Sequence, residues 1–263
     1  MNGNILNYEC AFAAEAAWKY QHAEKGEEVT GPPPFDRVAQ TIDARIAEIM
    51  RVTEAKKNMF FFTGSTNFRN EIAFTQKYKE RPGNKPFYYD AVRAYIERNY
   101  ESHECEGLEA DDLLGIMMTK YPGQFICCSR DKDLRQIPGW HYSWELNKQP
   151  QFGPVLIDEM GWIELTPKRK ILGGGAKFFF SQMLMGDTVD TIPGIPNTGP
   201  VTAYNALKEC QTYAECLEAV KVAYRAHYKL YWPEVMLEQG RLLWMVRELD
   251  AKKQPIMWSF DNT

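Results

Sequence analysis

The sequence predicts an α/β fold with a central, mostly parallel sheet flanked by helices, followed by a helical C-terminal region. Two short apolar runs, MFFFTG (59–64) and GQFICCS (123–129), have the composition of strands that are buried on both faces. Helical patterns precede and follow each run. Strands that alternate with helices in this way are typical of a layered parallel sheet.

The helices around these strands are predicted from the spacing of their apolar residues. Within 36–57, four branched apolar residues recur at helical spacing: Val38, Ile42, Ile46 and Ile49. The stretch 85–100 has a helical pattern after Pro86, and 108–121 is a helix with acidic residues in its first turn. These helices would cover the sheet.

The second half of the chain has a different organisation. Residues 140–170 mix Trp, Gly and Pro and predict only a short strand or hairpin. Helical patterns follow at 176–186 and 201–209, separated by the turn PGIPNTGP, and three more helices are predicted up to Leu249. We therefore expect an α/β core over 1–170, with a basic segment at about 66–98, and a helical region over 171–263.

Composition limits the functional classes. Of the 263 residues, 44% are hydrophobic and 25% charged, as in an ordinary soluble protein, and no apolar run approaches the ~20 residues that span a bilayer. The first residues do not have the pattern of a secretory signal, so we expect a cytoplasmic protein. The six cysteines lack CxxC spacing and nearby paired histidines, which disfavours zinc and favours reduced thiols.

Charge is segregated along the chain, although the net charge is only −4. From Thr66 to Arg98 there are seven basic and four acidic residues, whereas from Glu104 to Asp133 there are seven acidic and three basic ones. A basic segment beside an acidic pocket suits an enzyme that binds a phosphate backbone and cuts it with metal ions.

Seven carboxylates form three clusters that begin or follow predicted strands and helices. They are Glu109, Asp111 and Asp112; Asp131 and Asp133; and Asp187 and Asp190. Oxygen ligands without Cys or His suit hard cations such as Mg²⁺ or Mn²⁺. Two such ions roughly 4 Å apart would stabilise both the attacking and the leaving oxygen of a phosphodiester displacement. The clusters therefore predict a two-metal site.

Each cluster also has an ordinary explanation. Acidic residues favour helix N-termini, and a DxD pattern after a strand can be a solvated turn or part of a phosphatase. Phosphatases of that kind want Thr or Val two residues after the second Asp, where this chain has Arg135. The aromatic cluster of Trp140, His141 and Trp144 suits either base stacking or core filling, and RLLWMVREL (241–249) suits a core.

Four motifs carry a resemblance to a known family: NFRNEIAFTQKYKER (67–81), EGLEADDLLG (106–115), SRDKDLRQIPG (129–139) and GDTVDTIPGIPNTGPVTAYNAL (186–207). In this order they resemble the metal-dependent 5′–3′ exonucleases and flap endonucleases that bacteriophages encode. The resemblance covers roughly residues 1–250. It implies a PIN-like 5′ nuclease core with a C-terminal helix–hairpin–helix element.

The resemblance also implies roles for the acidic residues. Glu109, Asp111 and Asp112 would bind the first Mg²⁺, with Asp131 shared between the ions. The second Mg²⁺ would be bound by three further carboxylates: Asp133, Asp187 and Asp190. Mn²⁺ would substitute for Mg²⁺ at both positions.

The same resemblance implies where DNA binds. Arg69, Lys79 and Arg81 match the family's basic residues near the scissile phosphate, in the arch that the 5′ end threads, and Lys77 would add a DNA contact. In the turn PGIPNTGP, a K⁺ ion and backbone N–H groups would hold phosphates without reading bases. The residues concerned are Gly194, Ile195, Thr198 and Gly199.

The chain departs from the family pattern near its first residues. The family has Asp after its first strand, whereas the matching position here is Asn2 in NGN, and the apolar strand that precedes it in the family does not lie within the sequence. The family also commonly has an Asp after its second strand, where this chain has Gly64. We expect that an N-terminal extension with an apolar run, together with Asn2→Asp, would raise Mg²⁺-dependent cleavage.

The sequence thus predicts a 5′–3′ exonuclease or structure-selective flap endonuclease that acts on DNA 5′ ends and flaps and on RNA–DNA hybrids. Its expected setting is phage DNA replication or degradation in the host bacterial cytoplasm. The alternative is a DNA-binding protein of the same fold that is catalytically weakened by the loss of a first-metal ligand.

Overall fold

The computed structural model describes residues 1–26, 31–79, 84–147 and 149–260. The helices, in chain order, are α1 (Gly3–Glu24), α2 (Phe35–Thr53), α3 (Arg69–Ile72), α4 (Tyr89–Asn99), α5 (Ala110–Lys120), α6 (Gly175–Met185), α7 (Pro200–Leu207), α8 (Tyr213–Tyr228) and α9 (Trp232–Leu243). Short 3₁₀ turns, η1 and η2, lie at Asp133–Gln136 and Lys229–Tyr231. The strands are β1 (Phe60–Thr63), β2 (Ser102–Cys105), β3 (Ile126–Cys128), β4 (Gly139–Ser143), β5 (Phe152–Ile157), β6 (Trp162–Leu165) and β7 (Ile171–Gly174).

The strands form small sheets with parallel pairs at their centre. β1 pairs with β2 in parallel, β3 pairs with β4 in parallel, and β5 adds to β4 in the antiparallel sense. Between β1 and β3 lies Asn2, which forms a parallel bridge with Phe61 and donates its backbone N–H to the Cys128 carbonyl at 3.2 Å. The predicted α/β class is confirmed, but the strands are mixed: β1–β2 and β3–β4 are parallel, whereas β4–β5 and β6–β7 are antiparallel. Asn2 joins the β1–β2 sheet to the β3–β4–β5 sheet, and β6 and β7 form a third sheet.

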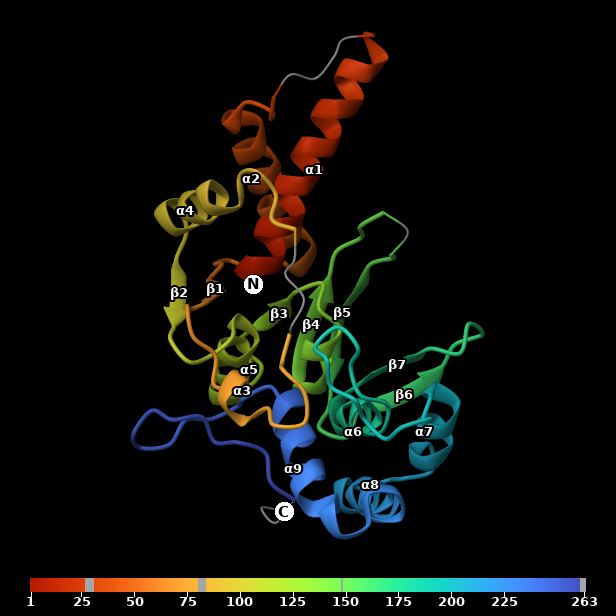
Figure 1. The fold of residues 1–263 in the computed structure, drawn as a ribbon. Helices are drawn as coiled ribbons and strands as arrows, with labels where there is room; N and C mark the ends of the chain where they lie inside the picture. The colour runs from red at the N-terminus through yellow and green to blue at the C-terminus, as the bar shows by residue number, and fades with distance from the viewer. Residues whose placement is uncertain (27–30, 80–83, 148, 261–263) are drawn as a thin grey trace.

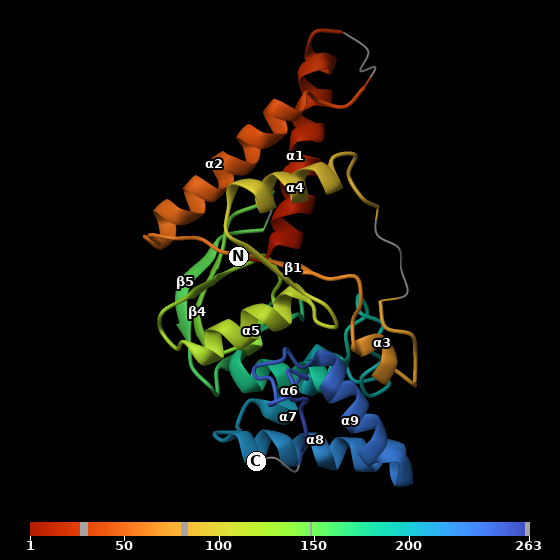
Figure 2. The same ribbon diagram turned by 90° about the vertical axis from the view of Figure 1, so that its left-hand side faces the viewer.

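Helices cover both faces of these strands, as Figures 1 and 2 show. Phe60 and Phe62 of β1 pack into a core with α1, α2 and α4, whereas Phe61, between them, packs against α5. This alternation is what a strand buried on both faces requires, because successive side chains point to opposite sides. Both apolar runs therefore have the two-sided burial expected from their composition.

The C-terminal helices α6 to α9 enclose a second core at the other end of the molecule (Figure 1). Phe179 and Phe180 of α6 and Tyr224 of α8 are fully buried there. The β6–β7 hairpin leads into α6, and the predicted boundary at 170/171 falls at the start of β7, so the region predicted to be helical begins with a strand. After α9 the chain continues in extended form, and Val246 returns to contact α5.

Candidate active site

The acidic residues at 109–112 lie at the start of α5 and face three different ways. Glu109 is the N-cap residue, and its backbone N–H donates to the Asp112 carboxylate at 3.0 Å. Glu109 is 8% exposed and Asp112 is fully buried, whereas Asp111 is only partly covered. The N-terminus of α5 attracts all three charges, but their surroundings separate them.

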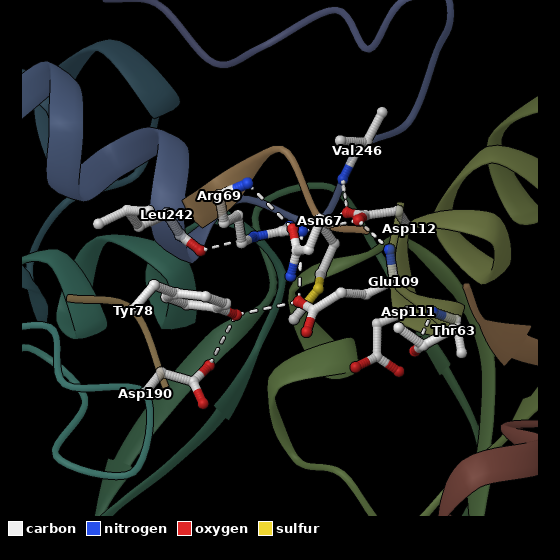
Figure 3. Close-up of polar contacts among 12 residues, drawn as sticks. Thr63, Asn67, Arg69, Tyr78, Glu109, Asp111, Asp112, Asp190, Leu242 and Val246 are labelled. Atoms are coloured by element: carbon white, nitrogen blue, oxygen red, sulfur yellow. Dashed lines mark hydrogen bonds and ion pairs between the residues drawn. The ribbon is translucent and has the colours of Figure 1, made fainter. Parts of the chain in front are cut away.

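Arg69 and Asp112 form a buried clamp between elements that are far apart in the sequence (Figure 3). Two guanidinium nitrogens of Arg69 donate to the two carboxylate oxygens of Asp112, each at 2.7 Å, and its Nε donates to the Leu242 carbonyl at 3.1 Å. Asp112 also accepts from the Val246 backbone N–H at 2.9 Å. The clamp joins α3 and α5 to the end of α9.

This geometry corrects two of the predicted roles. Arg69 is 1% exposed and Asp112 is 0% exposed, so neither reaches the surface where a phosphate or an ion would enter. Asp112 is the main counter-charge of Arg69, and Glu109 Oε2 also lies 3.3 Å from Arg69 Nη1. Sequence reasoning placed both among residues that contact ligands, because a buried arginine and an exposed one cannot be told apart by residue type.

Glu109 is the residue of the acidic pocket that the basic segment contacts. Lys79 Nζ lies 2.7 Å from Glu109 Oε1, and the Tyr78 hydroxyl donates to Glu109 Oε2 at 2.9 Å. The same hydroxyl lies 3.2 Å from Asp190 Oδ2 (Figure 3). The structure thus brings together three residues from distant segments, and the hydroxyl of Tyr78, which the sequence did not single out, holds two of them in place.

Asp111 and Asp131 form the most electrostatically unfavourable part of the pocket. Burial and the charge of Asp131 raise the pKa of Asp111 well above its usual range, and burial and the charge of Asp133 raise the pKa of Asp131 to about 6. Asn2 donates its side-chain amide to Asp111 Oδ1 at 2.5 Å. Two carboxylates whose ionised forms disfavour one another are suited to binding a cation between them.

A second acidic group lies where η1 meets the loop after α6. Lys132 Nζ is 2.9 Å from Asp133 Oδ1 and 3.6 Å from Asp187 Oδ2. Gln182 of α6 also donates to Asp133 Oδ1, at 2.6 Å, and its carbonyl oxygen is buried without a hydrogen-bond partner. Sequence reasoning missed Lys132, although it stands between the two aspartates of the DKD motif, and Gln182 had no signal of its own.

The donor set fits a divalent cation better than a softer metal. Across the described ranges, no three His, Cys, Asp or Glu side chains converge in a ready-made metal site. The predicted ligands are nevertheless all carboxylates, and burial together with neighbouring carboxylates raises the pKa of Asp111 and Asp131. Carboxylates of this kind suit Mg²⁺ or Mn²⁺.

The predicted DNA contacts in the turn before α7 differ in how far they are exposed to solvent. Gly194 and Ile195 are buried, and the Ile195 N–H donates to the Leu184 carbonyl at 2.9 Å. The Gly194 carbonyl accepts from the Tyr228 hydroxyl at 2.6 Å. Thr198 is half-buried, whereas Gly199, the N-cap of α7, is exposed. Gly194 and Ile195 therefore anchor the turn, and Thr198 and Gly199 form the part that a phosphate could reach.

The remaining candidates lie around the pocket. Lys77 is exposed on the segment that leads to Lys79, and Arg81 lies outside the described residues. Trp144 and His141 are buried in the core, whereas Trp140 is 40% exposed. Gly64 packs closely against the Cys105 carbonyl, so an added Cβ there would lie 2.7 Å from it. Over the part of the chain with described coordinates, every helix is too short or too polar to cross a membrane.

Comparisons with known proteins agree with the resemblance seen in the motifs. No family model matches the sequence. A 177-residue stretch is 29% identical to DNA polymerase I of Bacillus caldotenax, covering 61% of this chain and 18% of the polymerase. A 126-residue stretch is 33% identical to DNA polymerase I of Rhizobium leguminosarum, covering 46% and 11%. The chain thus corresponds to less than a fifth of each of these polymerases.

Two solved structures share the fold. The bacteriophage T5 D15 protein, co-crystallised with metal ions, matches with a TM-score of 0.58 at 13% identity over 92% of this chain and 87% of the other. A complex of the T5 D15 flap endonuclease with DNA and metal ions matches with a TM-score of 0.52 at 14% identity, over 80% and 81%. The predicted resemblance to the 5′ nucleases is confirmed.

Proposed function

We propose that the chain is a metal-dependent 5′ nuclease that hydrolyses phosphodiester bonds at DNA 5′ ends and flaps, and also acts on RNA–DNA hybrids. The observation that carries this proposal is the pocket in which Glu109, Asp111 and Asp131 lie beside Lys79. It combines oxygen ligands for cations with a positive charge for a phosphate. Support comes from the shared fold with a flap endonuclease that was crystallised with DNA and metal ions.

The proposed mechanism assigns each group of residues one task. Glu109, Asp111 and Asp131 would hold the first Mg²⁺, and Asp133, Asp187 and Asp190 would hold the second. When bound, the ions supply Lewis-acid stabilisation of charge on the scissile phosphate. Lys79, together with Arg81, orients that phosphate and offsets its charge, while the Arg69–Asp112 clamp fixes the start of α5. Thr198 and Gly199, with Lys77, bind the backbone away from the cut.

Phage replication or DNA degradation in a bacterial cytoplasm is the proposed setting. K⁺ at the turn 193–200 and replacement of Mg²⁺ by Mn²⁺ belong to the same proposal. Binding through backbone amides and charge, without base contacts, suits a nuclease that recognises the structure of its substrate and not its sequence.

The second candidate function is a DNA-binding protein with weakened catalysis. It is favoured by Asn2, whose neutral amide donates to Asp111 at the position where the resemblance implies an aspartate. An amide can offer a carbonyl oxygen to an ion but no charge, and Asn2 Oδ1 already accepts from the Ile5 N–H at 3.0 Å. On this reading the fold and the DNA-binding surface are retained while the affinity for the first ion is low.

A cleavage time course separates the two candidates. The substrates are 5′-labelled flap and blunt duplex, each with Mg²⁺ and with EDTA. We expect Mg²⁺-dependent cleavage that Asp131→Asn abolishes while DNA binding persists or tightens, because the change removes one repulsive charge from the pocket. Asp36→Asn, an equal change at the exposed start of α2, is the control. Duplex binding without cleavage would favour the second candidate, and unchanged turnover of Asp131→Asn would refute the metal assignment.

A further inference from the structure

Two lysines each bridge a pair of carboxylates across the acidic pocket. Lys79 Nζ lies 2.7 Å from Glu109 Oε1 and 3.7 Å from Asp190 Oδ1. Lys132 Nζ lies 2.9 Å from Asp133 Oδ1 and 3.6 Å from Asp187 Oδ2. In both bridges one carboxylate belongs to the α/β core and the other to the loop 187–190 after α6. The two ammonium groups therefore link the same two parts of the molecule.

The local electrostatics favour a positive charge at both positions. Each ammonium group lies within 3.7 Å of two carboxylates, which attract its positive charge. The backbone of Lys79 adopts a φ of 48°, which is uncommon for a residue other than glycine. The chain thus accepts an unfavourable local conformation where the Lys79 side chain meets Glu109.

Both lysines approach the pocket from the solvent side. The side chains of Lys79 and Lys132 are 42% and 56% exposed, whereas their carboxylate partners are between 10% and 22% exposed. A flexible lysine in such a position can swing into solvent without opening a core. An ion that enters from outside would meet the ammonium groups before it reached the carboxylate oxygens.

We propose that Lys79 and Lys132 are resident counter-cations of the two halves of the pocket and compete with divalent cations for the same carboxylate oxygens. The inference rests on the proposed function, since it takes these carboxylates as the metal-binding groups. Each lysine neutralises its carboxylate pair when no ion is bound and withdraws when one binds. Its presence therefore lowers the affinity of the pocket for divalent cations.

This role is distinguishable from that of an ordinary structural ion pair. Removing a lysine that only holds the pocket together would loosen the carboxylates and weaken ion binding. Removing a competing ammonium group would leave the same carboxylates with uncompensated charge, and ion binding would become tighter. The direction of the change in affinity decides between the two roles.

Lys132 is the better residue for the test, because Lys79 is also proposed to contact the scissile phosphate. Mn²⁺ binding to the full chain is measured by the loss of the electron paramagnetic resonance signal of free Mn²⁺, without DNA. We expect Lys132→Gln to bind Mn²⁺ about two- to fivefold more tightly than the wild type, the range expected for a partly exposed ion pair. Lys132→Arg should remain close to the wild type.

Two further variants make the measurement specific. Lys120→Gln is the matched control, since Lys120 is an exposed lysine over the Tyr121 ring, 5.2 Å from its centre, on the far end of α5. It should leave the affinity unchanged. Asp133→Asn should weaken Mn²⁺ binding, which would show that the measured ion occupies this pocket.

The outcomes separate the inference from the proposed function. Equal or weaker Mn²⁺ binding by Lys132→Gln, with binding and cleavage intact in the wild type, would overturn the inference alone. Tighter binding by Lys120→Gln to the same extent would also overturn it, because the effect would then be one of net charge. A wild-type protein that takes up no Mn²⁺ and cleaves nothing would overturn both.

Discussion

Lys79 is held by Glu109 at 2.7 Å, and its side chain is 42% exposed, so its ammonium group can move from the carboxylate to a phosphate at the pocket mouth. If it stabilises charge that develops on the scissile phosphate, Lys79→Ala should reduce kcat by roughly 10²–10³-fold with a smaller effect on substrate affinity. Steady-state cleavage of a labelled flap measures both. Lys85→Ala, in the same basic segment, is the control. A change confined to KM would make Lys79 a positioning contact on the remote backbone.

The buried His141 should make the stability of the fold depend on pH. Burial lowers the pKa of His141 to about 4 from the ordinary value of 6.5, and its Nε2–H donates to the Ile137 carbonyl at 2.7 Å. Below pH 6.5 the unfolded chain therefore binds more protons than the folded one. The stability contributed by the neutral ring is complete above pH 6.5 and is lost as the pH falls through 4, by roughly 3 kcal/mol in all.

Urea unfolding at pH 7 and pH 4.5 tests this effect. His141→Gln should lose less stability between the two pH values than the wild type, by roughly 2 kcal/mol. His103→Gln, a change of an exposed histidine on β2, should lose as much as the wild type. Equal losses in all three proteins would mean that the buried ring does not control the acid response.

Residue types revealed the chemistry of the pocket but not the environment of each side chain. The three acidic clusters were visible in the sequence because neighbouring carboxylates repel one another and are seldom grouped without a reason. In the structure, Tyr78 contacts both Glu109 and Asp190, and Lys132 contacts both Asp133 and Asp187. Whether an arginine lies at the surface or under a helix end depends on contacts between distant segments. Arg69 is buried because Leu242 and Asp112 meet there, and no local pattern specifies that meeting.

The elements that carry the site are fastened by the Arg69–Asp112 clamp between α3, α5 and the end of α9. Arg69→Met should destabilise the fold by about 3–5 kcal/mol, since it leaves the buried Asp112 carboxylate without its partner. The double variant Arg69→Met/Asp112→Leu should recover part of this loss. Chemical denaturation measures the free energy of unfolding. Arg93→Gln, which breaks partly exposed pairs with Glu97 and Glu104, should cost less than about 1 kcal/mol per pair.

The buried Arg69–Asp112 pair should contribute more to stability than an exposed ion pair does. If Arg69→Met and Arg93→Gln lower the free energy of unfolding by the same amount, the burial of the Arg69–Asp112 pair would add nothing to stability. Arg69 would then again be a candidate for contact with phosphate. A DNA-binding assay on the folded fraction provides the independent check.

At the scale of elements, apolar strands and amphipathic helices were predictable and polar strands were not. The runs 59–64 and 123–129 contain β1 and β3, and the spacing over 36–57 matches α2. β2 has the sequence SHEC and is mostly exposed, so its pairing with β1 rather than its composition makes it a strand. The last predicted helix was expected to reach Leu249 but ends at Leu243, because the backbone N–H groups of Met245 and Val246 donate to Gln136 and Asp112.

The whole molecule has a cleft between its two parallel strand pairs. The cleft has a volume of about 810 Å³ and is lined largely by apolar side chains, among them Met59, Phe61, Met118 and Cys127. The amine of Met1 lies at its edge and donates to the Met59 carbonyl at 2.7 Å, while burial lowers the pKa of this amine. Within the described residues, Asn2 is where β1 and β3 are bridged.

An apolar segment of about ten residues joined to Met1 should therefore stabilise the fold. Because Asn2 is parallel to Phe61, the added residues would run beside 55–60 and 123–126, which line the cleft. They would pair with the strand edges, cover the apolar lining and replace a buried charged amine with a peptide bond. We expect a rise in Tm of about 5 °C or more, measured by thermal unfolding. An extension of equal length made of Gly and Ser is the control, because it adds chain without apolar surface. If both extensions leave Tm unchanged, the cleft does not accept a strand, and the two sheets are held together by Asn2 and the surrounding helices alone.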